Sequence, residues 1–150
     1  MPQSLSSVLI HLIFSTKNRQ PLITESIETE LYKYLGGIFR TCQCPSLLIG
    51  GYKDHIHALF ALSRTCSLAE LVKEVKSSSS KWIKGKGDEF QHFQWQAGYG
   101  AFSIGQSSVE DLKNYIAYQK EHHRRASFEN EFRALCRKYN IEIDERYVWD

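Results

Sequence analysis

Two histidines one residue apart stand inside an apolar stretch of this chain. His55 and His57 open the run His-Ile-His-Ala-Leu-Phe-Ala, whose composition is typical of a β-strand. Because side chains alternate between the two faces of a strand, both imidazoles are expected on one face. Two imidazoles on one surface can bind a divalent metal ion. The ordinary alternative is a pair of hydrogen-bonded core or surface histidines.

A phenol and an amide form a second pair further along the chain. Tyr115 and Gln119 lie in a stretch where apolar residues follow helical spacing. Positions four residues apart fall about 40° from each other around a helix, so both side chains share one border of the apolar face. Tyr118 is a rival phenol, but it falls roughly opposite that face and is expected in solvent. Without the histidines, Tyr115 would be interpreted as a half-buried packing residue.

Together these side chains suit phosphoryl transfer. A metal ion held by His55, His57 and the Gln119 amide oxygen would keep open positions for phosphate oxygens, and Tyr115 could attack the phosphorus to form a phosphotyrosine. These ligands carry no negative charge, which favours an ion that the substrate also holds, Mg²⁺ or Mn²⁺, and nitrogen ligands favour Mn²⁺. Zinc is also compatible with these ligand types, but a zinc ion would favour hydrolysis by an activated water and leave Tyr115 without a role.

The segments around these residues predict the order β-α-β-β-α-β-α. Capping serines at Ser67, Ser107 and Ser127 and a capping threonine at Thr24 mark the four helix starts. The helices are expected to Arg40, to Lys84, through Gln119 and to about Tyr139, and the strands at 8–14, 47–51, 55–62 and 99–104. This α+β order predicts a ferredoxin-like or RRM-like split βαβ plait, an antiparallel sheet with helices packed on one face, plus an extra C-terminal helix. The other face would be free for a site.

Length and composition favour a soluble chain with one globular domain, residues 1–150. The chain is 42% hydrophobic, which suits one buried core. No apolar run approaches the roughly 20 residues that span a bilayer, and the N-terminus lacks the features of a signal peptide. We therefore expect a cytoplasmic protein without a membrane partner. The cysteines form no CxxC pair, which predicts reduced thiols without metal at Cys42, Cys44, Cys66 and Cys136.

The charge of the chain permits a nucleic acid as partner without requiring one. The net charge is only +2, but basic residues cluster at 81–86 and 122–125 and at Lys17 and Arg19. Aromatic side chains beside a basic groove can stack on unpaired bases. Trp95 and Phe102 are expected in the core, whereas Tyr99 is left open as a DNA contact.

With these residues, the chain resembles the single-tyrosine HUH-type transposases of small bacterial insertion sequences. His-Ile-His at 55–57, preceded by Asp54, is similar to the His-hydrophobe-His motif, and 115–119 is similar to the Tyr-x-x-x-Gln helix. Further similarity lies at 11–17, 76–82, 95–99 and 102–105. The C-terminal part, 122–150, departs from the pattern because it is longer than in compact members. It could shield the site, bind DNA or strengthen a dimer.

The resemblance implies a function and a set of site residues. Tyr115 would cleave single-stranded DNA, leaving a 5′-phosphotyrosine and a free 3′-hydroxyl, while His55, His57 and Gln119 hold Mg²⁺ or Mn²⁺. Family members act as homodimers, in which the tyrosine helix of one subunit can complete the histidine site of the other. They recognise DNA hairpins at element ends. The basic surface used for this would correspond loosely to Lys17, Arg19, Lys81 and Lys84.

Two other functions remain open from the sequence. A non-catalytic, domesticated hairpin-binding protein on the same fold would keep the basic and aromatic surface, but would have no reason to keep Tyr115 in register with the histidines. A metal hydrolase of small phosphate esters would work without Tyr115. The intact set of four side chains favours the strand-transfer enzyme.

Overall fold

The computed structural model describes residues 2–123 and 125–150. Four strands and five α-helices follow one another as β1 (Leu9–Ser15), α1 (Glu25–Thr41), β2 (Ser46–Tyr52), β3 (His55–Ala61), α2 (Leu68–Lys84), β4 (Gly100–Ile104), α3 (Val109–Ala117), α4 (Gln119–His122) and α5 (Phe128–Lys138). This order confirms the predicted α+β class, including the extra C-terminal helix.

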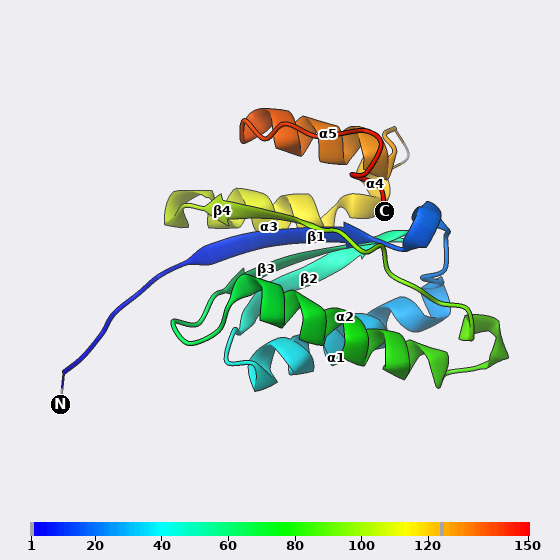
Figure 1. Ribbon diagram of the computed structural model, residues 1–150, viewed down its shortest axis with the longest axis horizontal. Helices are drawn as coiled ribbons and strands as arrows, with labels where there is room; N and C mark the ends of the chain where they lie inside the picture. Colours follow the sequence, from blue (N-terminus) through cyan, green and yellow to red (C-terminus); the bar gives the residue numbers. More distant parts are fainter. Residues whose placement is uncertain (1, 124) are drawn as a thin grey trace.

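The four strands form one antiparallel sheet in the order β2-β3-β1-β4. The histidine strand β3 is therefore internal, and His57 pairs with Ile13 of β1. Helices α1 and α2 cover one face of the sheet, as Figure 1 shows. The main hydrophobic core lies between them and the sheet.

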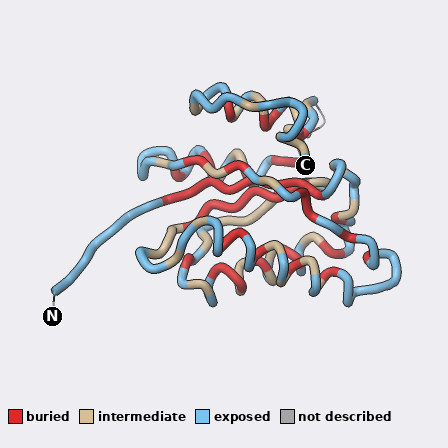
Figure 2. Tube along the Cα trace, viewed as in Figure 1, coloured by how far each residue is buried: buried red, intermediate tan, exposed pale blue. Residues whose placement is uncertain are grey.

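The opposite face of the sheet is also covered, which differs from the expected free surface. Helices α3 and α5 lie over it (Figure 1), so β1 is buried along its whole length (Figure 2). The reason is that both helices carry apolar stripes that need a partner surface. Val109, Leu112 and Ile116 of α3 pack with Leu59, and the apolar residues of α5 pack with Ile13. The histidines consequently lie in an interior.

Two glycines allow the helices of this second face to approach the sheet closely. A Cβ atom at Gly50 of β2 would lie 2.8 Å from the Cγ2 atom of Ile116 in α3, and one at Gly100 of β4 would lie 2.7 Å from Cε2 of Phe132 in α5. Larger residues would push either helix away. The two glycines therefore set how near α3 and α5 lie to β3.

The helix starts follow the capping pattern with two corrections. Thr24 stands at the N-cap position of α1, but its side chain makes no capping hydrogen bond and lies 2.8 Å from the Ser26 hydroxyl instead. Ser67 and Ser127 accept hydrogen bonds from the backbone N–H groups of Glu70 and Asn130, as predicted. The capping box expected at Ser107 is wrong, because this residue lies in the short 3₁₀ turn Gln106–Ser108 and α3 begins one residue later, at Val109. The turn satisfies backbone groups that the side chain was expected to satisfy.

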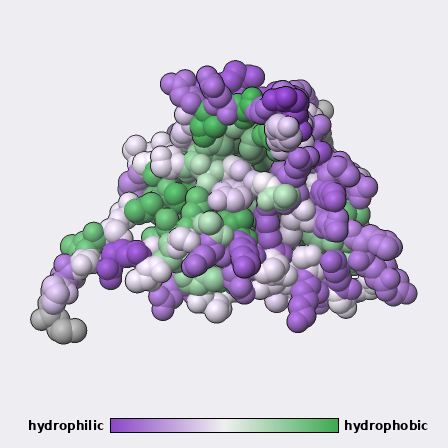
Figure 3. All heavy atoms as spheres, viewed as in Figure 1, coloured by the Kyte–Doolittle hydropathy of each residue, from purple (hydrophilic) through white to green (hydrophobic). Residues whose placement is uncertain are grey.

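The outer surface separates polar from apolar regions. Figure 3 shows hydrophilic residues over the outward side of α5 and apolar residues beneath it, over β4. All four cysteines are free thiols. Within residues 2–123 and 125–150, no helix combines the length and the apolar character that a membrane crossing requires.

Candidate functional site

The two histidines of β3 point toward the helices of the second face. His55 and His57 are fully buried, and their ring centroids lie 5.1 Å apart. Each ring is oriented through its Nδ1 atom. Nδ1 of His55 lies 2.7 Å from a carboxylate oxygen of Asp54, and Nδ1 of His57 lies 2.7 Å from Nε2 of His11 on β1. Both Nε2 atoms are thereby directed into the space beneath α3 and α5.

These contacts assign the protons on the rings. The Asp54 carboxylate can only accept, so His55 donates from Nδ1 and keeps a lone pair on Nε2 when neutral. Burial lowers the pKa of His11 to about 3, and lowers that of His57 to about 4 despite a nearby carboxylate. The His11 ring is therefore neutral near pH 7, and it can hold His57 through a neutral imidazole pair.

The helix that carries the phenol and the amide is interrupted between them. Helix α3 ends at Ala117 and α4 starts at Gln119, so the continuous helix expected here is wrong. The Gln119 side chain still donates to the backbone oxygen of Tyr115 at 3.3 Å. Tyr118, at the break, is 64% exposed, which confirms the prediction that it points to solvent.

Glu131 of α5 is the residue that joins all these groups, and the sequence did not reveal it. Its Oε1 atom lies 3.1 Å from Nε2 of His57, and its Oε2 atom accepts from the Tyr115 hydroxyl and, at 3.2 Å, from the Gln119 amide. The Glu131 side chain is 1% exposed. Phenol, amide and histidines of one chain are thus gathered around one carboxylate.

This arrangement determines the charges in the site. Burial alone would raise the pKa of Glu131, but hydrogen bonds from His123 and His57 outweigh it and hold that pKa far below its usual value. Burial and the neighbouring charge of Glu131 raise the pKa of Tyr115. Although burial opposes the change, the hydrogen bond to Glu131 raises the pKa of His123. The carboxylate is therefore ionised and the phenol protonated.

Sequence reasoning missed four residues of this site: His11, His122, His123 and Glu131. The adjacent histidines were interpreted as part of a basic cluster, and His11 lies far away in sequence. A signal for Glu131 was present, however. It falls between Phe128 and Phe132 on the apolar stripe of α5, where an acidic residue has no solvent to face.

The donor set is suited to a metal ion. His55 Nε2 faces Gln119 Oε1 at 3.0 Å and Glu131 Oε1 at 3.4 Å. The amide nitrogen of Gln119 is used elsewhere, so these are three electron-pair donors directed at one another, an arrangement that a cation stabilises. The donor atoms of His55, His57 and Glu131 lie within 4.8 Å of one another, as do those of His122, His123 and Glu131.

Known proteins share both the sequence pattern and the fold of this chain. The family described as Transposase IS200 like matches residues 4–119. The chain belongs to this IS200-like transposase family. The match confirms the predicted resemblance to single-tyrosine transposases. No curated protein matches the sequence significantly.

Two solved structures share the fold of this IS200-like transposase. A proposed transposase from Deinococcus radiodurans R1 has a TM-score of 0.62 at 18% identity, over 79% of this chain and 98% of that chain. A REP-associated tyrosine transposase bound to a REP hairpin has a TM-score of 0.61 at 13% identity, over 82% of this chain and 72% of that chain.

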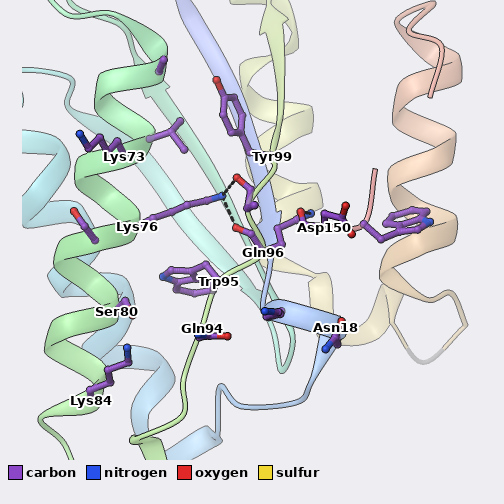
Figure 4. A pocket seen from close by; sticks show the side chains of 16 residues that line it. Asn18, Lys73, Lys76, Ser80, Lys84, Gln94, Trp95, Gln96, Tyr99 and Asp150 are labelled. Atoms are coloured by element: carbon purple, nitrogen blue, oxygen red, sulfur yellow. Dashed lines mark hydrogen bonds between the residues drawn. The ribbon is translucent and has the colours of Figure 1, made fainter. Parts of the chain in front are cut away.

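The residues expected to bind DNA are only partly brought together in this transposase. A hollow of about 790 Å³ lies beside α2 and is lined by Lys17, Lys84 and Tyr99 (Figure 4). Lys81 and Arg19 are not among its lining residues, and the Arg19 guanidinium instead donates to the backbone oxygen of Trp149 at 2.7 Å. Two further lysines of α2, Lys73 and Lys76, line the hollow. We call this hollow the lysine groove.

Aromatic residues near the lysine groove divide as expected. Trp95 and Phe102 are 8% and 3% exposed, which confirms that they belong to the core. Tyr99 is 38% exposed on the wall of the groove, and the Lys76 ammonium lies 5.7 Å from its ring centroid. Tyr99 is therefore an accessible ring beside positive charge, a combination that suits stacking on a base.

Proposed function

We propose that this chain is a metal-dependent single-stranded DNA endonuclease and strand transferase, with residues 1–150 acting as one catalytic domain. It would act through a 5′-phosphotyrosine on Tyr115 at hairpin-bearing DNA ends. The observation that carries the proposal is the shared carboxylate, because Glu131 accepts from the Tyr115 hydroxyl and lies 3.1 Å from His57. A nucleophile and a set of metal ligands therefore stand side by side.

The chemistry follows from the roles of the side chains. His55, His57 and Gln119 would hold a divalent ion, Mg²⁺ or Mn²⁺, which when bound polarises the phosphate and neutralises developing charge. Tyr115 forms a bond to phosphorus as the bond to the 3′ oxygen breaks, and its proton passes to Glu131. Glu131 then passes that proton on to the departing 3′ oxygen, so atoms and charge balance. Rejoining is the reverse, with a 3′-hydroxyl attacking the phosphotyrosine.

The proposed substrate is supported by the lysine groove. Phosphate oxygens of a DNA hairpin attract ammonium groups, and an exposed ring can stack on an unpaired base. The similar structure bound to a REP hairpin supports the same substrate class. We propose that Lys17, Lys73 and Lys84 contact the backbone and that Tyr99 contacts a base.

One observation favours a second candidate function, hairpin binding without catalysis. Glu131 occupies the space between Tyr115 and the histidines, and both histidines are fully buried. A closed site of this kind would suit a protein that only binds DNA. Its surface for binding would be the same groove.

A covalent-adduct assay separates the two functions. The protein is incubated with labelled single-stranded hairpin oligonucleotides and Mn²⁺, and a protein–DNA band is sought on a denaturing gel. We expect a band in the parent protein, none in Tyr115→Phe or with a chelator, and an unchanged band in Tyr118→Phe, the exposed tyrosine on the same segment. Hairpin binding without a band would favour the binding protein, and a metal-dependent cleavage that survives Tyr115→Phe would favour a hydrolase.

A further inference from the structure

A third imidazole enters the site from the residue that follows α4. The Nδ1 atom of His123 lies 2.6 Å from the backbone oxygen of Ala126, which can only accept, so Nδ1 carries the proton. Its Nε2 atom faces Gln119 Oε1 at 2.9 Å and Glu131 Oε1 at 3.2 Å. The His123 side chain is only 4% exposed. His123 therefore repeats the arrangement of His55, with a ring nitrogen directed at two oxygen acceptors.

Electron pairs directed at one another repel unless a cation lies among them. Around Gln119 Oε1 and Glu131 Oε1, the imidazoles of His55 and His123 approach from two elements, and His57 Nε2 lies 3.1 Å from Glu131 Oε1. That cation could be a proton on one of the imidazoles, or it could be a metal ion. Either one would be buried beside Glu131, whose single negative charge would compensate it.

The separations between these donors match the edges of a metal coordination sphere. Ligands about 2.1 Å from an ion lie about 3.0 Å apart at a right angle and about 3.4 Å apart at a tetrahedral angle. Five separations between these donors run from 2.9 to 3.4 Å. These separations fit the edges around one ion that all five donor atoms share.

We propose that His123 and Glu131 are ligands of the same ion as His55, His57 and Gln119, so that one chain supplies five donors. This inference rests on the metal position of the proposed function. Three imidazole nitrogens, an amide oxygen and a carboxylate oxygen leave one position of an octahedron for a phosphate oxygen. The second oxygen of Glu131 holds the Tyr115 hydroxyl beside that position.

The ligand set predicts which ions bind. Mg²⁺ prefers oxygen ligands and retains its water molecules, whereas Mn²⁺ accepts imidazole ligands more readily. For a site with three nitrogen ligands, Mn²⁺ therefore has the higher affinity of the two ions. The carboxylate also supplies a negative charge that a set of two histidines and an amide lacks. We expect Mn²⁺ to bind the free protein at least about tenfold more tightly than Mg²⁺.

The test counts the nitrogen atoms around bound Mn²⁺ in the DNA-free protein by electron spin-echo spectroscopy. We expect three imidazoles in the parent protein and two in His123→Gln, with Mn²⁺ affinity lowered at least about tenfold. His92→Gln, an exposed histidine outside the site, should keep three. Glu131→Gln should keep three nitrogens but bind Mn²⁺ more weakly, and circular dichroism checks that each variant is folded.

Each other result is decisive. Two imidazoles in the parent protein, or an affinity that His123→Gln leaves unchanged, would overturn the inference and identify His123 as a charged partner of Glu131. A parent protein that forms the covalent DNA adduct while showing two imidazoles would refute the inference and leave the proposed function standing. A parent protein that shows three imidazoles but forms no covalent DNA adduct would support the inference and count against the proposed function.

Discussion

Burying an ionised carboxylate costs several kcal/mol unless charges or hydrogen bonds compensate it. Glu131 meets that requirement with donors from three parts of the chain, because Tyr115, Gln119 and His57 all contact its oxygens. Burial and the neighbouring charge of Glu131 both raise the pKa of Tyr115, so the phenol stays protonated beside the carboxylate. At the scale of one residue, Glu131 is the acceptor toward which these hydrogen-bond donors are directed.

His11 offers a test of how the histidines are held. It contacts no proposed donor except His57, whose Nδ1 atom lies 2.7 Å from its Nε2. We expect His11→Phe to keep the fold but to lower Mn²⁺ affinity by about 10–100-fold, because the His57 ring loses the partner that orients it. His11→Gln should recover part of the affinity, since an amide can make the same hydrogen bond. Equal affinity in the parent and His11→Phe, measured by titration calorimetry, would contradict this role.

Elements with a clear period could be predicted from the sequence. The strand at 55–61 and the apolar stripe of helix α2 depend on residues close together in the sequence. Their secondary structure could therefore be predicted from the spacing of apolar residues. The interruption at Tyr118 and the packing of α5 over the sheet depend on residues far apart in sequence. The residues of the candidate site differ in the same respect. Local spacing in the sequence was enough to predict His55, His57, Tyr115 and Gln119. The positions of His123 and Glu131 depend instead on how α5 packs against the sheet.

Helix α2 fixes the segment that leads into β4 through a single ammonium group. Nζ of Lys76 donates to the backbone oxygens of Gln96, Ala97 and Gly98 at 2.8, 3.2 and 2.6 Å (Figure 4). Lys76→Met removes this donor from three partners. We expect the free energy of unfolding to fall by about 2–3 kcal/mol in urea denaturation. Lys73→Met, at an exposed lysine nearby, should change the free energy of unfolding by less than about 0.5 kcal/mol. An equal loss of stability in both variants would refute the stabilising role of the Lys76 hydrogen bonds.

Across the whole molecule, residues 148–150 lie between the lysine groove and the helix that carries Glu131. The backbone N–H of Gly98, beside the groove, donates to the Asp150 oxygen at 2.9 Å, and the Trp149 ring packs 5.8 Å from that of Phe132 in α5. The wall of the lysine groove and helix α5 are therefore linked through direct contacts of Trp149 and Asp150.

The proposed catalytic groups of one chain lie within contact distance of one another, so we propose that the centre is completed within a single subunit. The dimer implied by the family resemblance stays a prediction. Tyr115→Phe and His57→Ala should each fail to form the covalent adduct, and their mixture should stay at background, because neither chain holds both groups. Parent protein diluted with Tyr115→Phe is the control and should keep its activity in proportion. A band restored in the mixture would instead demonstrate exchange of the tyrosine helix between subunits.

The family match ends at residue 119, whereas the carboxylate that accepts from the Tyr115 hydroxyl stands at 131. The span by which relatives are identified therefore does not contain everything that surrounds this phenol. Two members could keep identical His-x-His and Tyr-x-x-x-Gln motifs and still diverge in reactivity through changes after them. Keeping the motifs therefore does not by itself keep the surroundings of the Tyr115 hydroxyl.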